Sequence, residues 1–197
     1  MDVYCETDTL SNIERVEGSQ HTDTLTGDDR DNVFRGLDGD DVIDGGAGTD
    51  EVRYSYATSG VDVDLEAGTA SDGYGGTDTL SNFEDVQGSS HADTLTGSSG
   101  NDFLFGGDGD DVIKGGVGDD SLYGNAGDDV IVEGGGYDYI GGGDGADTFV
   151  FTSKDGSTRN TKNTDGYHGD QIEDFTSGVD KIGFQGMEGI SYSGRMY

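Results

Sequence analysis

The sequence predicts an all-β protein, a parallel β-roll with stacked nonapeptide turns and a C-terminal β cap. Three observations predict this fold: a nine-residue repeat, one large apolar residue at a fixed place in every repeat, and glycine-rich segments between those apolar residues. Four repeats run without a gap over residues 18–53 and seven more over residues 88–150, which makes eleven units. Tandem repeats of this kind are typical of solenoids, in which each unit buries its apolar face against its neighbours.

Each position of the repeat has its own character. Position one is glycine in ten units, with Glu133 as the exception, and position six is aspartate in ten units, with Asn32 as the exception. Positions seven to nine predict a short strand whose middle side chain points inward. The expected inward residues, at position eight, are Leu25, Phe34, Ile43, Val52, Leu95, Leu104, Ile113, Leu122, Ile131, Ile140 and Phe149. Two repeats, 18 residues, should close one coil, and stacked coils should lie about 4.8 Å apart.

A longer repeat divides the chain into two parts, because Thr7–Gly27 recurs as Thr77–Gly97. Residues 1–87 are expected to hold a lead-in, the short array (18–53) and a strand insertion, in which Val61, Val63 and Leu65 alternate with polar residues. Residues 88–197 are expected to hold the long array (88–150) and a capping segment (151–197). In that segment, residues 153–168 read as a polar loop, and residues 171–184 as two short strands joined by a turn.

Composition limits the possible partners. Asp and Glu number 42 against 10 Lys and Arg, a formal net charge of −32, and only 30% of residues are hydrophobic. Such a chain does not offset its ordering entropy by burial alone. The charge disfavours nucleic acid and anionic membranes as partners and favours cations. Cys5 is the only cysteine, so no intramolecular disulfide forms, and no apolar run reaches transmembrane length.

The position-six residues are the candidate metal ligands. An 18-residue coil aligns every second one in a column, so that a hard cation between stacked turns would find carboxylate and turn carbonyl oxygens. Calcium suits this all-oxygen shell better than magnesium, and zinc would prefer sulfur or imidazole. One ion between each stacked pair gives about seven Ca²⁺ sites. The candidate side-chain ligands are Asp23, Asn32, Asp41, Asp50, Asp93, Asp102, Asp111, Asp120, Asp129, Asp138 and Asp147. The candidate turn glycines are Gly39, Gly48, Gly100, Gly107, Gly109, Gly116, Gly118, Gly127, Gly136 and Gly145.

Calcium is therefore expected to act as a folding switch. The core supplies one apolar residue in nine, and unneutralised columns of carboxylates would repel each other strongly. With calcium about tenfold above the dissociation constant, each site adds roughly 1.4 kcal/mol, and seven add on the order of 10 kcal/mol. That sum is comparable to the whole stability of a typical domain. Asp8 and Asp78 occupy equivalent places in the two lead-ins and could each hold an additional ion.

The units GGDGDDVIK and GGVGDDSLY resemble the repeats-in-toxin (RTX) family of proteins exported by bacterial type I secretion. This resemblance implies a right-handed parallel β-roll, with calcium held by the glycine turns and the position-six aspartates, in a chain that folds only outside the cell. The segments GADTFVFTSKDGSTR and DQIEDFTSGVDKIGF resemble the C-terminal domains of serralysin-type metalloproteases and the R-modules of mannuronan C5-epimerases. His21, Arg30 and His91 depart from the pattern by replacing glycine at position four. Both histidines are interpreted as structural turn residues rather than ligands.

No catalytic motif is present, since HExxH, GxSxG and nucleotide-binding fingerprints are absent, and we expect no enzyme in this chain. Two hypotheses remain. The first is a calcium-binding module that folds outside the cell and serves as the C-terminal folding and export part of a larger secreted bacterial protein. The second is a module of an epimerase, lyase or adhesin that binds an anionic, alginate-like polysaccharide or a cell surface, with the basic cluster Lys154, Arg159 and Lys162 as its contact.

Overall fold

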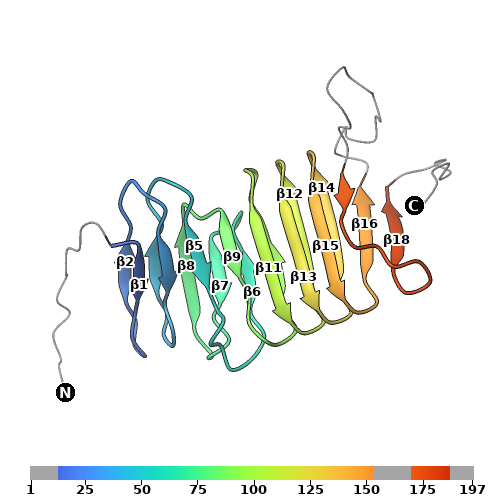
Figure 1. Ribbon diagram of the computed structural model, residues 1–197. Helices are drawn as coiled ribbons and strands as arrows, with labels where there is room; N and C mark the ends of the chain where they lie inside the picture. Colours follow the sequence, from blue (N-terminus) through green and yellow to red (C-terminus); the bar gives the residue numbers. More distant parts are fainter. Residues whose placement is uncertain (1–12, 153–169, 187–197) are drawn as a thin grey trace.

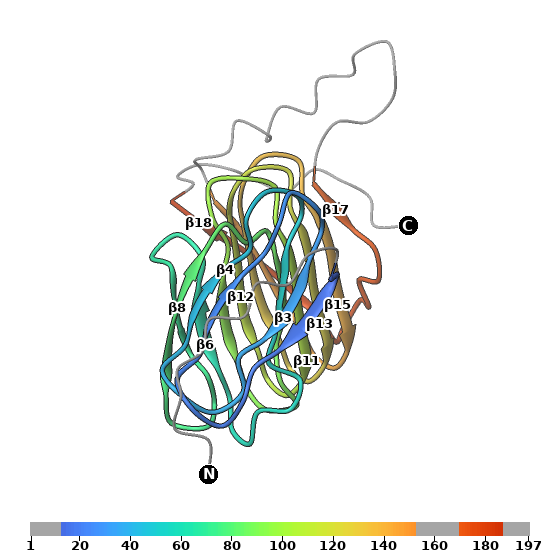
Figure 2. The ribbon, with the colours of Figure 1, turned by 90° about the vertical axis from the view of Figure 1, so that its left-hand side faces the viewer.

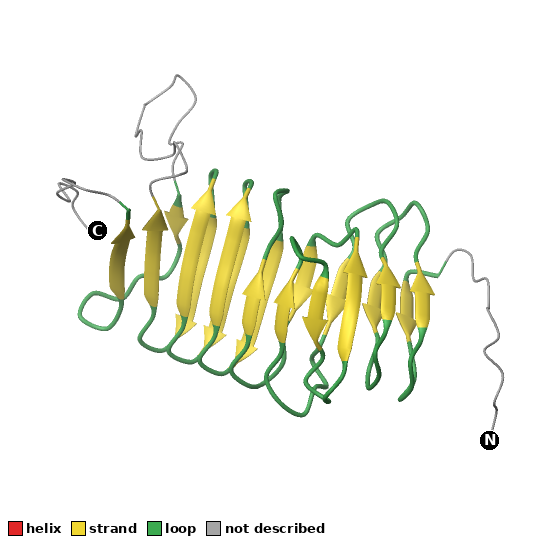
Figure 3. Ribbon diagram, turned by 180° about the vertical axis from the view of Figure 1, so that it is seen from behind, coloured by secondary structure: helices red, strands yellow, loops and turns green. Residues whose placement is uncertain are grey.

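A computed structural model describes residues 13–152 and 170–186. These residues form eighteen strands stacked in an elongated array (Figure 1) and contain no helix (Figure 3). Accordingly, no helix of the described ranges could span a bilayer. The strands are β1 (Arg15–Glu17), β2 (Thr24–Thr26), β3 (Val33–Arg35), β4 (Val42–Asp44), β5 (Glu51–Arg53), β6 (Asp62–Asp64), β7 (Thr69–Ser71), β8 (Thr77–Ser81), β9 (Asp85–Gln87), β10 (Thr94–Thr96), β11 (Phe103–Asp108), β12 (Val112–Val117), β13 (Ser121–Ala126), β14 (Val130–Gly135), β15 (Tyr139–Asp144), β16 (Thr148–Thr152), β17 (Gln171–Ile172) and β18 (Lys181–Gln185).

The strands form two sheets that face each other across a narrow core (Figure 2). The eight-stranded sheet has the order β1-β3-β5-β9-β11-β13-β15-β17, and the ten-stranded sheet has the order β18-β16-β14-β12-β10-β6-β7-β8-β4-β2. Within both arrays, parallel neighbours pair residues 18 apart, as in Leu95 with Ile113 and Leu104 with Leu122. Two nonapeptides therefore make one coil, and the expected parallel β-roll is confirmed.

One residue from each nonapeptide fills the core. Ten of the eleven position-eight side chains are at most 1% exposed, from Phe34 to Phe149. Leu25 is only partly buried, because it lies on β2, the edge strand of the ten-stranded sheet. Within the arrays the core is thus a row of side chains one residue wide on each sheet, which is little apolar burial for eleven nine-residue units.

Strands of the long array are longer than the three residues expected. Strands β11 to β15 each span six residues and continue through the glycines that open the next repeat. Gly116 pairs with Gly134 and Asn125 with Gly143, so the pairing runs into the turns. Successive glycine-rich turns thus stack closely enough to continue the backbone pairing of the strands.

The insertion between the arrays adds strands to one sheet only. Strand β7 pairs antiparallel with both β6 and β8, whereas β5 pairs directly with β9 in the opposite sheet. The expected strand at Val61–Leu65 is present as β6, with Val63 fully buried. Both sheets run on past residue 87, because β9 pairs with β5 and β11 in one sheet and β10 pairs with β6 in the other. The division of the chain into residues 1–87 and 88–197 therefore stays a prediction from the sequence repeats.

The C-terminal segment forms one further coil rather than a separate hairpin. The two expected strands are present, but β17 joins the eight-stranded sheet beside β15, and β18 joins the ten-stranded sheet beside β16. Ile172 lies opposite Ile140, and Ile182 opposite Phe149, so both continue the position-eight rows. The predicted loop over residues 153–168, together with Cys5 and Asp8, lies outside the described residues.

Candidate metal sites

The position-six carboxylates lie in two columns, one along each sheet. In the ten-stranded sheet, Asp111 Oδ1 accepts a hydrogen bond from the backbone N–H of Asp93 at 2.8 Å, and Asp129 Oδ1 accepts one from Asp111 at 2.8 Å. In the eight-stranded sheet, Asp120 Oδ1 accepts from the N–H of Asp102 at 2.9 Å. Each carboxylate is thereby fixed to the coil that precedes it.

The same contact recurs in the short array and at the end of the long one. Asp41 Oδ1 accepts from the N–H of Asp23, and Asp50 Oδ1 from the N–H of Asn32, at 2.8 and 2.7 Å. The remaining contacts of this kind join Asp120 N–H to Asp138 and Asp129 N–H to Asp147, at 2.9 and 3.0 Å. The columns thus have the predicted membership, while metal binding by these oxygens stays a prediction.

The second oxygen of the position-six side chain separates ten of the eleven turns into two classes, and the turn of Asp147 belongs to neither. In what we call open turns, Oδ2 is buried and has no hydrogen-bond partner. The open-turn carboxylates are Asp41, Asp50, Asp111, Asp120, Asp129 and Asp138. All six residues are at most 2% exposed. A buried carboxylate oxygen without a donor is costly, and a cation would satisfy it.

In what we call closed turns, the second oxygen of the position-six side chain, or the amide oxygen of Asn32, accepts hydrogen bonds from position two of the same repeat. Asp102 Oδ2 accepts from the N–H of Ser98 at 2.7 Å and from the Ser98 hydroxyl at 3.2 Å. Ser19 and Ser89, also at position two, hold Asp23 and Asp93 through equivalent backbone N–H contacts. Asn32 accepts from the N–H of Asp28 at 2.9 Å. These four closed turns are the first two units of each array.

The backbone conformation of the open turns requires glycine, as position four shows. Gly127 has a φ of +144°, a backbone conformation that L side chains rarely adopt, and a Cβ there would lie 2.1 Å from the carbonyl oxygen of Gly109. The predicted glycines Gly39, Gly48, Gly107, Gly109, Gly116, Gly118, Gly127, Gly136 and Gly145 all have left-handed φ values. Gly100 does not, because it belongs to a closed turn and its N–H donates to the Ser98 hydroxyl.

The closed turns also account for the departures at position four. His21, Arg30 and His91 occupy that position in closed turns, and none of them has a positive φ. Their side chains therefore impose no backbone strain. Each of these turns instead has a serine or aspartate at position two.

Burial makes the charged form of the columns unfavourable. It raises the pKa of Asp111 and Asp120 from 3.8 to about 7, and that of Asp129 and Asp138 to about 6, with desolvation as the largest cause. Backbone N–H donors lower these pKa values, and neighbouring carboxylates raise them. Burial also raises the pKa of Asp50 to about 6. A divalent cation at the open oxygens would reverse this balance by favouring the charged form.

Four residues outside the arrays extend the columns. Asp78, Glu84, Asp170 and Asp180 accept hydrogen bonds from the backbone N–H groups of Asp41, Asp50, Asp138 and Asp147, at 3.1, 2.9, 3.1 and 3.1 Å respectively. The sequence signal is an acidic residue two places before a buried or partly buried apolar residue, as in Asp78 before Leu80. Asp78 lacks an open oxygen, because its Oδ2 accepts from the Tyr54 hydroxyl at 3.1 Å.

Position five carries a further row of contacts that the repeat pattern did not explain. Asp110 accepts from the N–H of Asp128, and Asp119 from the N–H of Tyr137, at 2.8 and 2.9 Å. Asp128 accepts from the N–H of Ala146 at 2.9 Å. These position-five aspartates therefore hydrogen-bond each turn to the turn stacked on it.

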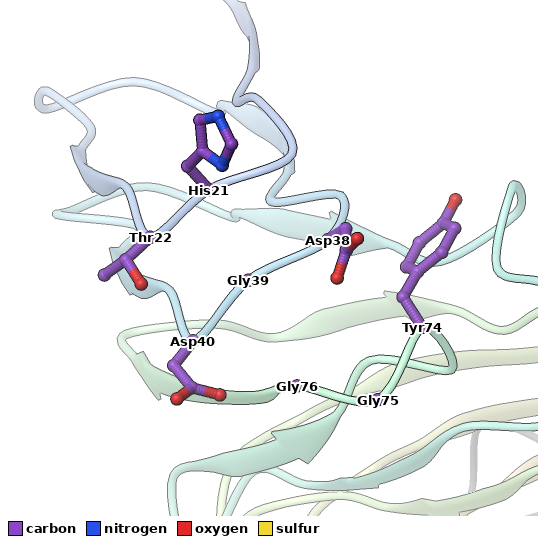
Figure 4. Close-up of a pocket in the computed structure, with 8 residues that line it drawn as sticks. All are labelled: His21, Thr22, Asp38, Gly39, Asp40, Tyr74, Gly75 and Gly76. Atoms are coloured by element: carbon purple, nitrogen blue, oxygen red, sulfur yellow. The ribbon is translucent and has the colours of Figure 1, made fainter. Parts of the chain in front are cut away.

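A pocket of about 670 Å³ opens beside three stacked turns of the short array and the insertion (Figure 4). Gly39 and Gly76 contribute backbone to its lining, and the side chains of Asp38 and Asp40 lie beside them in the view. Just below this surface, Asp72 is fully buried and its Oδ1 accepts from three successive N–H groups, those of residues 74–76. Its Oδ2 has no hydrogen-bond partner. Sequence reasoning missed Asp72 because it lies outside the repeat.

Solved structures similar to this chain include the following two. One is the solution structure of the AlgE6R3 subunit of the Azotobacter vinelandii mannuronan C5-epimerase, with 35% identity over 55% of this chain and 56% of that chain, and a TM-score of 0.31. The other is the crystal structure of the extracellular lipase LipA from Serratia marcescens, with 22% identity over 96% of this chain and 35% of that chain, and a TM-score of 0.24. The match thus spans little more than half of the first chain and about a third of the second. A comparison with curated proteins gives no match.

A sequence profile of the RTX calcium-binding nonapeptide repeat matches in four copies, at residues 17–52, 87–122, 106–140 and 123–151. The copies coincide with the two arrays and with every open turn, and together they cover just over half of the 197 residues. The position-six columns and the glycine turns are the structural form of this repeat, and the chain belongs to the RTX calcium-binding nonapeptide repeat family.

Proposed function

We propose that this chain is a calcium-responsive folding module that completes its β-roll when calcium binds outside the cell. In this proposal it serves as the C-terminal folding and export part of a larger type I-secreted bacterial protein, and any catalytic activity resides elsewhere in that protein. The observation that carries the proposal is the set of six buried aspartate oxygens without a hydrogen-bond partner, one in each open turn.

The six open oxygens are one fewer than the seven ions expected from the stacked pairs, and Asp147 would supply the carboxylate of the seventh. In each of the seven stacked pairs within the arrays, the second residue along the chain is a carboxylate from a glycine turn, namely one of the six open-turn residues or Asp147. An ion between two stacked turns would take this carboxylate and turn carbonyls as ligands, as calcium requires. The uncharged amide of Asn32 predicts that its pair is the weakest site, although the open oxygen of that pair belongs to Asp50.

In this proposal, the calcium concentration decides whether the module folds. Extracellular calcium modules bind with dissociation constants on the order of 10⁻⁴–10⁻³ M, far above cytosolic calcium levels. Without ions, the buried carboxylates lose solvation with no compensating charge, and the narrow core offers little to offset this cost. The chain would stay open for export and fold after it leaves the cell.

Circular dichroism tests the switch. In chelator at pH 8, the spectrum should be that of an unfolded chain, and millimolar calcium should produce the strand signal together with a smaller hydrodynamic radius. Millimolar magnesium serves as the control and should have little effect, because it keeps its waters and needs a tight octahedral shell. The same strand content in chelator and in calcium would show that the switch is wrong.

A second candidate function is polysaccharide binding, and a row of aromatic rings favours it. Phe103, Tyr123 and Tyr139 lie side by side on the outer face of the eight-stranded sheet, with ring centroids 5.4 and 6.1 Å apart. Phe103 is 42% exposed. Such rings can pack against the flat faces of sugar residues. The basic residues Lys154, Arg159 and Lys162, suggested from the sequence as a contact for an anionic chain, lie outside the described residues.

Glycan binding in saturating calcium separates the two functions. If the aromatic row binds sugar, Phe103→Ala and Tyr123→Ala should each abolish retention on an alginate column while calcium-dependent folding persists. If the basic cluster binds it, charge reversal at residues 154, 159 and 162 should do so instead. A chain that folds with calcium and shows no retention would leave the folding module as the sole function.

A further inference from the structure

Three carboxylates converge where the long array meets the C-terminal coil. Oxygens of Glu133, Asp138 and Asp170 lie within 4.8 Å of one another. Glu133 and Asp138 are buried, at 0% and 2% exposed, and Asp170 is partly buried. Glu133 is the single position-one residue of the eleven units that is not glycine, so this arrangement occurs once in the arrays.

Backbone contacts hold each of the three side chains in place. Glu133, on β14, accepts through Oε1 from the N–H of Thr152 at 2.5 Å. Asp138, just before β15, accepts through Oδ1 from the N–H of Asp120 at 2.9 Å, and Asp170, just before β17, accepts from the N–H of Asp138 at 3.1 Å. Asp138 Oδ2 is buried and accepts no backbone hydrogen bond, and the Asp138 carboxyl lies within hydrogen-bonding reach of the Glu133 carboxyl. One oxygen of every carboxylate is thus anchored.

We infer that Glu133, Asp138 and Asp170 together hold one calcium ion, and that this is the tightest site of the chain. The inference rests on the proposed calcium function and adds to it two ligands outside the nonapeptide consensus. An ordinary open turn offers one orphaned carboxylate oxygen, whereas three carboxylates surround this position. The affinity of a calcium site rises with the number of charged ligands and with their rigidity. Because the set contains oxygen only, it suits a hard cation rather than zinc.

The position of the site gives it a structural role. Glu133 belongs to the ten-stranded sheet, and Asp138 and Asp170 precede neighbouring strands of the eight-stranded sheet, near the C-terminal end of the stack (Figure 1). Asp170 immediately precedes β17, the first strand of the C-terminal coil. An ion here would connect that coil to the last units of the array, so the tightest site would fasten the end of the roll.

Substitution of Glu133 by the consensus residue distinguishes a ligand from a structural side chain. The other ten units have glycine at position one, and the fold accommodates it there. If Glu133 only fills space, Glu133→Gly should leave calcium affinity unchanged. If Glu133 is a ligand, restoring the consensus should weaken the tightest site about tenfold or more and lower by one the number of ions retained at low free calcium.

The experiment is calcium titration by calorimetry, with equilibrium dialysis in calcium buffers to count the ions retained. The variants are Glu133→Gly, Glu133→Gln, Asp170→Asn and the Glu133→Gln/Asp170→Asn pair. Glu66→Gln, at an exposed position on the insertion, removes the same charge as a matched control. We expect each single variant to lose the tightest site, the double variant to lose little more because both residues serve one ion, and the control to retain it.

The outcomes separate this inference from the proposed function. If the wild type binds calcium and folds, yet the variants keep the tightest site, the three-carboxylate site is wrong and the calcium module stands. If the wild type neither binds calcium nor folds in it, the proposed function fails as well. Circular dichroism in saturating calcium checks that each variant still forms the roll, and Asp170→Asn keeps the test decisive if Glu133→Gly does not fold.

Discussion

Protons should replace calcium as the counterions of the columns, so that the calcium-free chain folds at acidic pH. Burial raises the pKa of Asp111 and Asp120 to about 7, and that of Asp129 and Asp138 to about 6, against 3.8 in the unfolded chain. Because the folded pKa is the higher one, the roll binds more protons than the unfolded chain above about pH 4. The resulting stability is fully present below pH 3.8 and is lost as the pH rises through 6 and 7.

The size of the effect follows from these pKa values. Each pKa unit corresponds to about 1.4 kcal/mol of differential protonation free energy. Lowering the pH from 8 to 5 should therefore stabilise the roll by about 2.7 kcal/mol for each carboxyl with a pKa near 7 and by about 1.4 kcal/mol for each with a pKa near 6. The four residues together contribute about 8 kcal/mol, which is within the range of a typical domain stability.

Far-UV circular dichroism of the chain in chelator measures this directly, from pH 8 to pH 5, where the chain stays above its isoelectric point of about 4.1. We expect strand signal at pH 5, lost with a midpoint between pH 6 and 7, and almost no pH dependence in saturating calcium. Asp111→Asn with Asp120→Asn should retain more structure at pH 8 in chelator, whereas Asp62→Asn, at an exposed position, should not. A chelated chain that is equally unfolded at pH 5 and at pH 8 would refute the reasoning.

Three further predictions concern single positions of the long array. Ile113→Ala, at a core position with 0% exposure, should lower the free energy of unfolding in saturating calcium by about 2–5 kcal/mol, measured by urea denaturation. Gly127→Ala should raise the calcium concentration needed for folding, because its Cβ would meet the Gly109 carbonyl oxygen at 2.1 Å, while Gly100→Ala, where the nearest atom would be 3.5 Å away, should be nearly neutral. Asp120→Asn should lower the number of calcium ions bound, measured by equilibrium dialysis. Asp102→Asn should leave that number unchanged, because Ser98 already occupies its Oδ2.

The architecture and the columns could be predicted because they depend on periodicity alone. A repeat of nine residues with one apolar position fixes an 18-residue coil, and the pairing of Leu104 with Leu122 and of Asp102 N–H with Asp120 follows from that offset. The continuation of the columns through Glu84 could not be predicted in this way, whereas Asp78 is recognisable in the sequence because it precedes a lead-in leucine as the position-six residues precede theirs. Asp78 and Glu84 lie 37 and 34 positions after their column neighbours Asp41 and Asp50. The 18-residue offset of the arrays therefore does not identify them.

Which carboxylates are open could not be predicted from the aspartate pattern, because it depends on the turn backbone. The relevant signal is at position two, where serine places its N–H and hydroxyl on the aspartate oxygen, as Ser98 does for Asp102. Glycine at the same position, as in Gly116, adopts a left-handed φ and leaves the carboxylate of its unit, Asp120, without a donor. The three-carboxylate site was equally hidden, because Asp170 lies 37 residues after Glu133 in the sequence.

The order of the two turn classes along the chain follows from what a cation needs. An ion between stacked turns would take ligands from both, and the long array begins next to residues outside the nonapeptide pattern. At the start of the long array, the neighbours of Asp93 and Asp102 in the columns are Val61 and Glu84, which follow loops outside the nonapeptide pattern. Ser89 and Ser98 close those carboxylates with local hydrogen bonds, so we expect the first coil to form without an ion of its own. Calcium dependence should then begin at the second coil, where open turns first face glycine-rich or serine-closed neighbours of the same repeat.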